Sequence, residues 1–225
     1  MIVAGADGCP TGWVVCRRDG DGALDIKVVK ALADACEGLS VLAVDMPFGL
    51  MDAPRAGGRD CEQEARARLR GKASSVFPSP CRPALACASY AEANAISKKL
   101  GVGLTQQMFR ILPKVREIDD LLRARPELRT VVYEAHPELA FARMNDGKPV
   151  LSKKRKPDGY AERRSLLARH GLEADIERLP GATRDDVLDA MACCRTALLI
   201  AAGTGTRLGP PDARDCHGLA MNIWF

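Results

Sequence analysis

The stretch Val41-Leu-Ala-Val-Asp45 consists of four apolar residues followed by a single carboxylate. Such a uniformly apolar run is typical of a strand that is buried on both faces, as in a parallel sheet. The chain begins with a similar run, Met1-Ile-Val-Ala-Gly-Ala-Asp7, and a third, Thr130-Val-Val-Tyr-Glu134, follows much later. Ligands of open α/β sheets bind beyond the carboxyl ends of the strands. The three carboxylates are therefore expected to converge if these strands are neighbours.

The residues between the first two of these runs predict two tight hairpins and a short helix. Turn residues at 8–12 and 19–22 separate apolar runs at 13–17 and 24–29, and residues 30–38 form a helix that ends at Gly38. The order is strand, strand, strand, helix, strand, with the fourth strand parallel to the first through a right-handed crossover. This order predicts an α/β protein with an RNase H-like mixed sheet, in which three antiparallel strands precede parallel strands and helices flank the sheet.

Residues 50–128 show no clear strand and predict helices at 60–70, 89–100 and 105–124. We interpret this segment as a helical insertion after the fourth strand, within a single domain that spans residues 1–225. A last helix is expected from about Thr183 to about Ala202, because apolar residues recur there at helical spacing.

The composition sets limits on the class of protein. The chain has 225 residues, of which 47% are hydrophobic, and this is enough for one sizeable core. Its 33 basic and 29 acidic residues give a formal charge of +4, which permits a polyanionic substrate without demonstrating one. Nine cysteines without a Cys-x-x-Cys pair indicate a reducing cytoplasm. We expect no membrane association, because no leader and no run of about 18 apolar residues is present, and the oligomeric state is left open.

Five acidic residues are the candidate catalytic residues: Asp7, Asp45, Glu134, Asp186 and Asp189. A carboxylate that ends an apolar strand is costly to bury unless it is paired or bound to a metal. Asp186 and Asp189 are three residues apart on the last helix and therefore share a face. The four aspartates are the expected ligands of Mg²⁺ or Mn²⁺, which prefer oxygen ligands. Two such ions about 4 Å apart would neutralise phosphoryl oxygens and activate water.

Each of these residues also has a structural interpretation. The strand-end aspartates precede turn residues, where a carboxylate can accept backbone N–H bonds. Asp186 lies three residues after Thr183, which is the spacing of a capping box. Glu138 suits the first turn of a following helix and is also the alternative to Glu134 as the site residue.

Arg59, Arg66, Arg82 and Lys154 are the candidate substrate-binding residues. They belong to two basic stretches, 59–82 and 153–156. Cations there would position an anionic substrate over the metal ions. Solvated helix faces and a solvated loop are the structural alternatives.

Six motifs follow one another along nearly the whole chain: Gly5-Ala-Asp7-Gly-Cys-Pro-Thr-Gly-Trp13, Val44-Asp45-Met-Pro47-Phe-Gly-Leu, Arg59-Asp-Cys-Glu-x-x-Ala-Arg66, Ser75-Val-Phe77-Pro-x-Pro80-x-Arg82, Glu134-Ala-His-Pro-Glu138 and Asp185-Asp-x-Leu-Asp189-Ala. Together they resemble the domain of unknown function 429 family, which is described as predicted nucleases with an RNase H fold. The resemblance implies that fold and that activity. It also implies that Asp7 matches the first-strand aspartate, Asp45 the fourth-strand acid, and Asp186 with Asp189 the pair on the last helix. The three arginines at 59, 66 and 82 match the family's pattern.

The sequence thus predicts a metal-dependent nuclease or phosphodiesterase that hydrolyses phosphodiester bonds of nucleic acid or another substrate by a two-metal carboxylate mechanism. One alternative is an actin-like nucleotide-binding phosphotransferase, which shares the strand order and begins with an Asp-Gly turn such as Asp7-Gly8. Such proteins normally need two domains of this kind. The other alternative is a non-catalytic nucleic-acid-binding module, against which four plausible metal ligands argue. The substrate stays open among DNA, RNA, a junction and a small phosphate ester.

Overall fold

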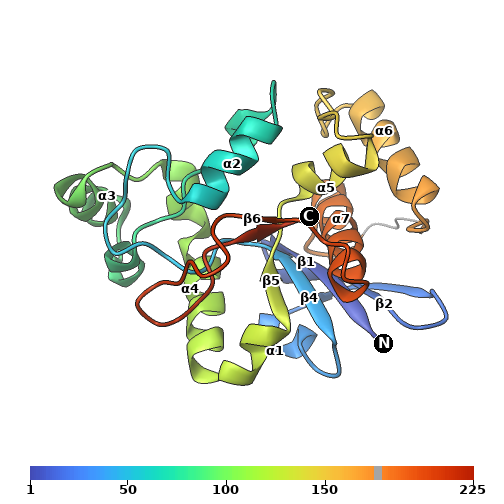
Figure 1. Cartoon of the computed structure of the whole chain (residues 1–225), viewed down its shortest axis with the longest axis horizontal. Helices are drawn as coiled ribbons and strands as arrows, with labels where there is room; N and C mark the ends of the chain where they lie inside the picture. Colours follow the sequence, from blue (N-terminus) through green and yellow to red (C-terminus); the bar gives the residue numbers. More distant parts are fainter. Residues whose placement is uncertain (175–178) are drawn as a thin grey trace.

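A computed structural model describes residues 1–174 and 179–225 of the chain, and Figure 1 shows its arrangement. Its central five-stranded sheet has the order β3-β2-β1-β4-β5. β1 (Val3–Cys9), β2 (Gly12–Arg18) and β3 (Leu24–Val29) pair antiparallel, whereas β4 (Val41–Asp45) and β5 (Val132–Glu134) run parallel to β1. This is the RNase H-like topology that the sequence predicts.

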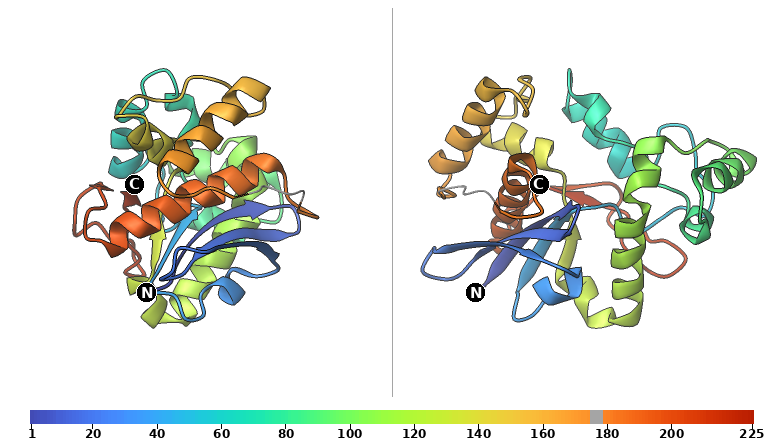
Figure 2. Two further views of the ribbon diagram at one scale, coloured as in Figure 1. Left: turned by 90° about the vertical axis from the view of Figure 1, so that its right-hand side faces the viewer. Right: turned by 180° about the vertical axis from the view of Figure 1, so that it is seen from behind.

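Helices cover both faces of the sheet (Figure 2). On one face α7 (Arg184–Ala201) packs against β1, β2 and β4, and it also contacts α5 (Pro137–Met144) and α6 (Pro157–Arg169). On the other face lie α1 (Leu32–Ala35) and α4 (Gln106–Ala124). The sheet is therefore the middle of three layers.

The alternation of side chains along β4 decides which residues face α7. Leu42 belongs to the buried cluster under α4, whereas Ala43 belongs to the cluster under α7. Successive side chains of a strand point to opposite faces, so Asp45 shares the α7 face with Ala43. Asp7 is the register partner of Asp45 in β1 and points to the same face.

α7 lies against β1 at Gly5 so closely that no side chain fits there. A Cβ atom at this position would lie 2.0 Å from the backbone nitrogen of Cys194 and 2.2 Å from the backbone oxygen of Ala190. Side chains in protein interiors are packed at the density of crystals, and the backbone of a helix cannot yield by such an amount locally. Gly5 is therefore the residue that lets α7 lie directly on the sheet.

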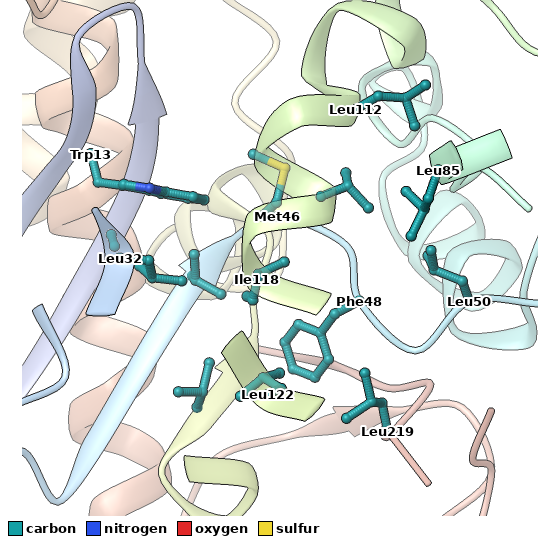
Figure 3. Close-up of a cluster of buried hydrophobic side chains, with 14 of the residues drawn as sticks. Trp13, Leu32, Met46, Phe48, Leu50, Leu85, Leu112, Ile118, Leu122 and Leu219 are labelled. Carbon is teal, nitrogen blue, oxygen red and sulfur yellow. The ribbon is translucent and has the colours of Figure 1, made fainter. Parts of the chain in front are cut away.

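Residues 46–131, all of which the structure describes, form helices and no strand. These are α2 (Asp60–Arg68), α3 (Tyr90–Leu100), α4 and the 3-10 turns η1 (Ala73–Ser75), η2 (Arg82–Ala86) and η3 (Pro126–Thr130). Figure 3 shows one buried apolar cluster that runs from Trp13 in the sheet through Ile118 and Leu122 of α4 to Leu50 and Leu85. The sheet and the helical segment share this cluster.

Two elements differ from the sequence-based prediction. The helix expected at 30–38 is only the four-residue α1, because Gly38 turns the chain at φ 69° and Ser40 N already donates to Ile2 O. β6 (Arg207–Leu208) and β7 (Ile223–Trp224) form a small antiparallel ribbon, and two-residue strands are too short to show a periodic pattern. Among the described residues no helix has the length and apolar character needed to cross a membrane.

We predict that Gly5→Ala destabilises the protein, because the added methyl group collides with the α7 backbone. Overpacking of this kind costs about 1–3 kcal/mol or more. Gly20→Ala is the matched control, since a Cβ atom there meets only Met1 N at 3.8 Å. Urea unfolding of both variants measures the difference, and equal midpoints for the two would contradict the role given to Gly5.

Candidate active site

Asp7, Asp45 and Asp189 converge at the carboxyl end of the sheet. One carboxylate oxygen of each lies within 4.8 Å of the corresponding oxygens of the other two. The two strand residues come from β1 and β4, where they are register partners, and Asp189 comes from α7, which packs on the same face. We call these three residues the acidic cluster.

Burial and mutual repulsion make the acidic cluster hard to ionise. Burial raises the pKa of Asp7 well above its usual value, and the charges of Asp45 and Asp189 raise it further. Burial likewise raises the pKa of Asp45 to about 7 and the pKa of Asp189 to about 6, although the Lys154 ammonium opposes both shifts. Three like charges at this spacing are stable together only beside a cation.

Lys154 supplies one positive charge. Its ammonium forms an ion pair with Asp189 Oδ2. Burial lowers the pKa of Lys154, but the three carboxylates of the acidic cluster raise it above the usual range. One ammonium leaves most of the negative charge of the cluster uncompensated.

Asp189 has an open ligand position. The residue is 4% exposed, and its Oδ1 atom is buried without a hydrogen-bond partner among the described residues. Buried carboxylate oxygens are almost always partnered. A set of three convergent carboxylates with such an orphaned oxygen fits a hard divalent cation such as Mg²⁺ or Mn²⁺.

The acidic cluster lies in the wall of a cavity of about 440 Å³. Figures 1 and 2 show α2 and α5 at the same end of the sheet, and residues after α2 and at the start of α5 contribute further walls. The lining also includes the apolar Phe77, together with Met108 and Ile111 of α4. The sequence did not identify Met108 and Ile111 as cavity residues, because their spacing is that of ordinary core positions of a helix. Phe77 was found only as part of a Pro-rich motif, without a role at the site.

The structure does not bring Glu134 to the acidic cluster. Glu134 is the register partner of Val44, which belongs to the buried cluster under α4, so its side chain points to the other face of the sheet. There Arg59 Nη1 donates to Glu134 Oε2 at 2.8 Å and Arg59 Nη2 donates to Oε1 at 2.5 Å. Phe48 N also donates to Oε2, at 3.1 Å. Both carboxylate oxygens of Glu134 are thus occupied.

Arg59 is buried and ties three segments together. Its Nε donates to Glu62 Oε1 at 2.8 Å, and its Nη1 donates to the carbonyl oxygen of Phe48 at 2.6 Å. The residue is 2% exposed, although it is one of the residues that line the cavity. The pair of Arg59 and Glu134 therefore fixes the segment that directly follows Asp45.

Asp186 forms the helix cap that its spacing from Thr183 allows. Its carboxylate accepts a hydrogen bond from Thr183 N at 2.8 Å, and Asp186 N donates to Thr183 Oγ1 at 3.3 Å, which completes a capping box at the start of α7. Its charge still contributes to the raised pKa of Asp7. Asp186 is thus near the acidic cluster without being part of it.

Arg66 and Arg82 bind other parts of the protein. Arg66 Nη1 donates to Val76 O at 2.9 Å. Arg82 pairs with Asp119 at 2.9 Å and with Asp215. Of the four basic residues that the sequence predicts as substrate-binding, the structure brings Lys154 to the acidic cluster and Arg59 to the cavity wall, whereas Arg66 and Arg82 are not among the residues that line the cavity.

The sequence profile of the family described as "Protein of unknown function (DUF429)" matches residues 5–214, so the chain belongs to this family. No curated protein matches the chain. Among solved structures, one described as "Thermus thermophilus RuvC structure" is similar with a TM-score of 0.34 and 16% sequence identity, over 91% of this chain and 98% of that one.

We predict that Asp45→Asn changes the pH dependence of stability in the ion-free protein. A carboxyl group with a pKa that is higher in the folded than in the unfolded state binds more protons when folded, so its contribution to stability falls as pH rises. The raised pKa of Asp45, about 7, places this loss between about pH 4 and about pH 7. The variant should therefore lose less stability than the wild type between about pH 5 and about pH 8, and should be the more stable of the two at the higher pH.

Urea unfolding in EDTA at both pH values measures this effect, with the exposed Asp212→Asn as the control. The same pH dependence in Asp45→Asn and the wild type would show that the folded protein does not raise the pKa of Asp45.

A second prediction concerns Arg59. Replacing it by Gln leaves Glu134 and Glu62 buried without their cation, and breaking a buried ion pair in this way costs about 3–5 kcal/mol. Arg55→Gln is the matched control, because Arg55 pairs with Asp60 at the surface, where both side chains are about half exposed. Such exposed pairs contribute at most about 1 kcal/mol. Equal losses of unfolding free energy in the two variants would refute the role of Arg59 as a buried tie.

Proposed function

We propose that this protein is a metal-dependent nuclease or phosphodiesterase whose acidic cluster holds the metal. The observation that carries the proposal is the convergence of Asp7, Asp45 and Asp189 within 4.8 Å, with the buried and unpartnered Oδ1 atom of Asp189 among the oxygens. Oxygen donors alone, with no histidine or cysteine in the group, suit Mg²⁺ or Mn²⁺.

The residues at this site have different roles in the proposed reaction. Asp7, Asp45 and Asp189 hold the metal from two strands and a helix, which are more rigid supports than loops. When bound, divalent ions neutralise phosphoryl oxygens and lower the pKa of coordinated water. Lys154 lies beside the cluster and offers its ammonium to a phosphate oxygen of the substrate. Arg59 and Glu134 position the segment after Asp45 and do not touch the substrate in this proposal.

The two-metal mechanism predicted from the sequence needs more oxygen ligands than these three residues provide. Asp186 and Glu138 are the candidates, because the charge of Asp186 raises the pKa of Asp7 and the charge of Glu138 raises the pKa of Asp45. Asp186 would have to leave its capping box, and Glu138 its contact with Arg163 at 2.8 Å. The number of ions bound per chain decides between one ion and two.

We further propose nucleic acid as the substrate and the cytoplasm as the location. The location rests on the cysteines: all nine lie in the described residues as free thiols, and eight of them are buried. Buried thiols without disulfides are typical of a reducing compartment.

The test is to replace Asp7 and Asp189 separately by Asn and to titrate Mn²⁺ into each variant by calorimetry. Each change removes a charged ligand and leaves the shape of the side chain, so we expect loss of Mn²⁺ binding and a fall in Mn²⁺-dependent cleavage by about a hundredfold or more. Single-stranded, double-stranded and branched nucleic acids are the substrates. The exposed Asp212→Asn should behave as the wild type does.

Cleavage by Asp7→Asn at the wild-type rate would contradict the proposal. Binding of Mn²⁺ by the wild type without cleavage of any nucleic acid would direct the search to small phosphate esters. Absence of binding would make the acidic cluster structural and the proposed function wrong.

A further inference from the structure

A second, strongly basic depression adjoins the cavity of the acidic cluster. It has a volume of about 540 Å³ and is lined by Lys154, Arg155, Lys156, Pro157, Tyr160, Thr183, Arg184 and Asp185. We call it the basic groove. Lys154 lines both the cavity and the basic groove, so the two spaces are neighbours.

The charge of the basic groove suits an anion with several negative groups. Four of its eight lining residues are cationic, and Asp185 is the acid among them. Asp185 pairs with Arg155 at 3.1 Å. In addition, α6 starts at Pro157 and α7 starts at Arg184, so two helix N-termini lie in the lining. Each adds a partial positive charge.

The cavity itself has room for one small unit of substrate. Its volume of about 440 Å³ lies toward the small end of the range for small-molecule sites. Its lining carries the acidic cluster and also apolar residues, among them the 40%-exposed Phe77. Aromatic and apolar surfaces of this kind stack on the flat face of a nucleobase, whichever of the bases it is.

These features distinguish between forms of nucleic acid. Asp189 is buried, so a phosphate that reacts at the acidic cluster must enter the cavity. A duplex is stiff, and extracting one nucleotide from its stack costs a few kcal/mol, whereas a single strand enters with little cost. A single strand also bends freely enough to continue from the cavity into the basic groove.

We propose that this protein binds single-stranded nucleic acid, with one nucleotide in the cavity and the adjoining phosphates in the basic groove. Lys154 stands at the boundary and contacts the phosphate between the two. This inference rests on the proposed function, because it takes the acidic cluster as the place of reaction, and it adds the strand type and a second subsite.

The test uses Lys156→Ala/Arg184→Ala, which removes two cations from the basic groove. Lys98→Ala/Lys99→Ala is the matched control, because it removes the same charge from the exposed end of α3. Fluorescence anisotropy measures binding of a labelled single-stranded 12-mer, as DNA and as RNA, and of a hairpin duplex. EDTA is present throughout, so that metal binding and cleavage do not enter the measurement.

We expect the wild type to bind the single strands roughly tenfold more tightly than the duplex, and the groove variant to lose roughly tenfold in affinity for them. Its plot of the logarithm of affinity against the logarithm of salt concentration should be shallower by about 1.4, since each phosphate contact on a single strand contributes about 0.7. The control variant should keep the wild-type affinity and slope. Because Arg184 lies over the Tyr160 ring at 5.7 Å, Lys156→Glu serves as a second variant that leaves this contact intact.

Unchanged affinity in both groove variants would overturn the proposal, as would duplex binding equal to that of the single strands or no nucleic-acid binding by the wild type. Hydrolysis of bis(p-nitrophenyl) phosphate by the wild type with Mn²⁺ is measured in parallel. Failure of that reaction counts against the proposed metal-dependent activity and leaves the anisotropy result to decide on the basic groove, so the two failures are distinguishable.

Discussion

The close contact between α7 and β1 at Gly5 is the constraint on which the site depends. Two residues of a strand advance by about 6.7 Å and four residues of a helix advance by about 6 Å. Gly5 lies against Cys193 and Cys194. Two residues after Gly5 in β1, and four residues before Cys193 in α7, each chain segment carries a carboxylate, and the two advances bring these carboxylates to the same end of the sheet. These are Asp7 and Asp189. A larger residue at Gly5 would move the helix away from the sheet and separate the two carboxylates. The geometry of the acidic cluster therefore depends on the close packing of the core at Gly5.

Charge compensation separates the structural acids of this protein from the acids of the site. Every other buried acidic group discussed above faces a guanidinium, which satisfies carboxylate oxygens in a fixed geometry. The acidic cluster differs, since three carboxylates share one ammonium and one buried oxygen has no partner among the described residues. The compensated groups are Glu62 and Glu134 with Arg59, Glu138 with Arg163, and Asp119 and Asp215 with Arg82.

The sequence predicted the strand order and the convergence of carboxylates because both follow from local patterns: apolar runs, turn residues and the ends of strands. It did not predict which face of the sheet the Glu134 side chain points to, although the alternation of side chains along β5 bears on this. Val132 and Glu134 share a face, and the register with β4 turns that face toward α4. The missing step was the register, which depends on contacts distant in sequence. The same holds for Arg59, whose partner Glu134 is 75 residues away, and no local pattern distinguishes such an arginine from one that binds substrate.

The charge balance at the acidic cluster decides which residues attract a phosphodiester to the site. Three ionised carboxylates and the Lys154 ammonium leave two negative charges uncompensated. One divalent ion cancels that charge and makes the site neutral. Two ions held with the help of Asp186 and Glu138 add four positive and two negative charges, so the site is neutral in that case as well. With either number of ions the site has no net positive charge, so it depends on the basic groove beside Lys154 to attract a phosphodiester.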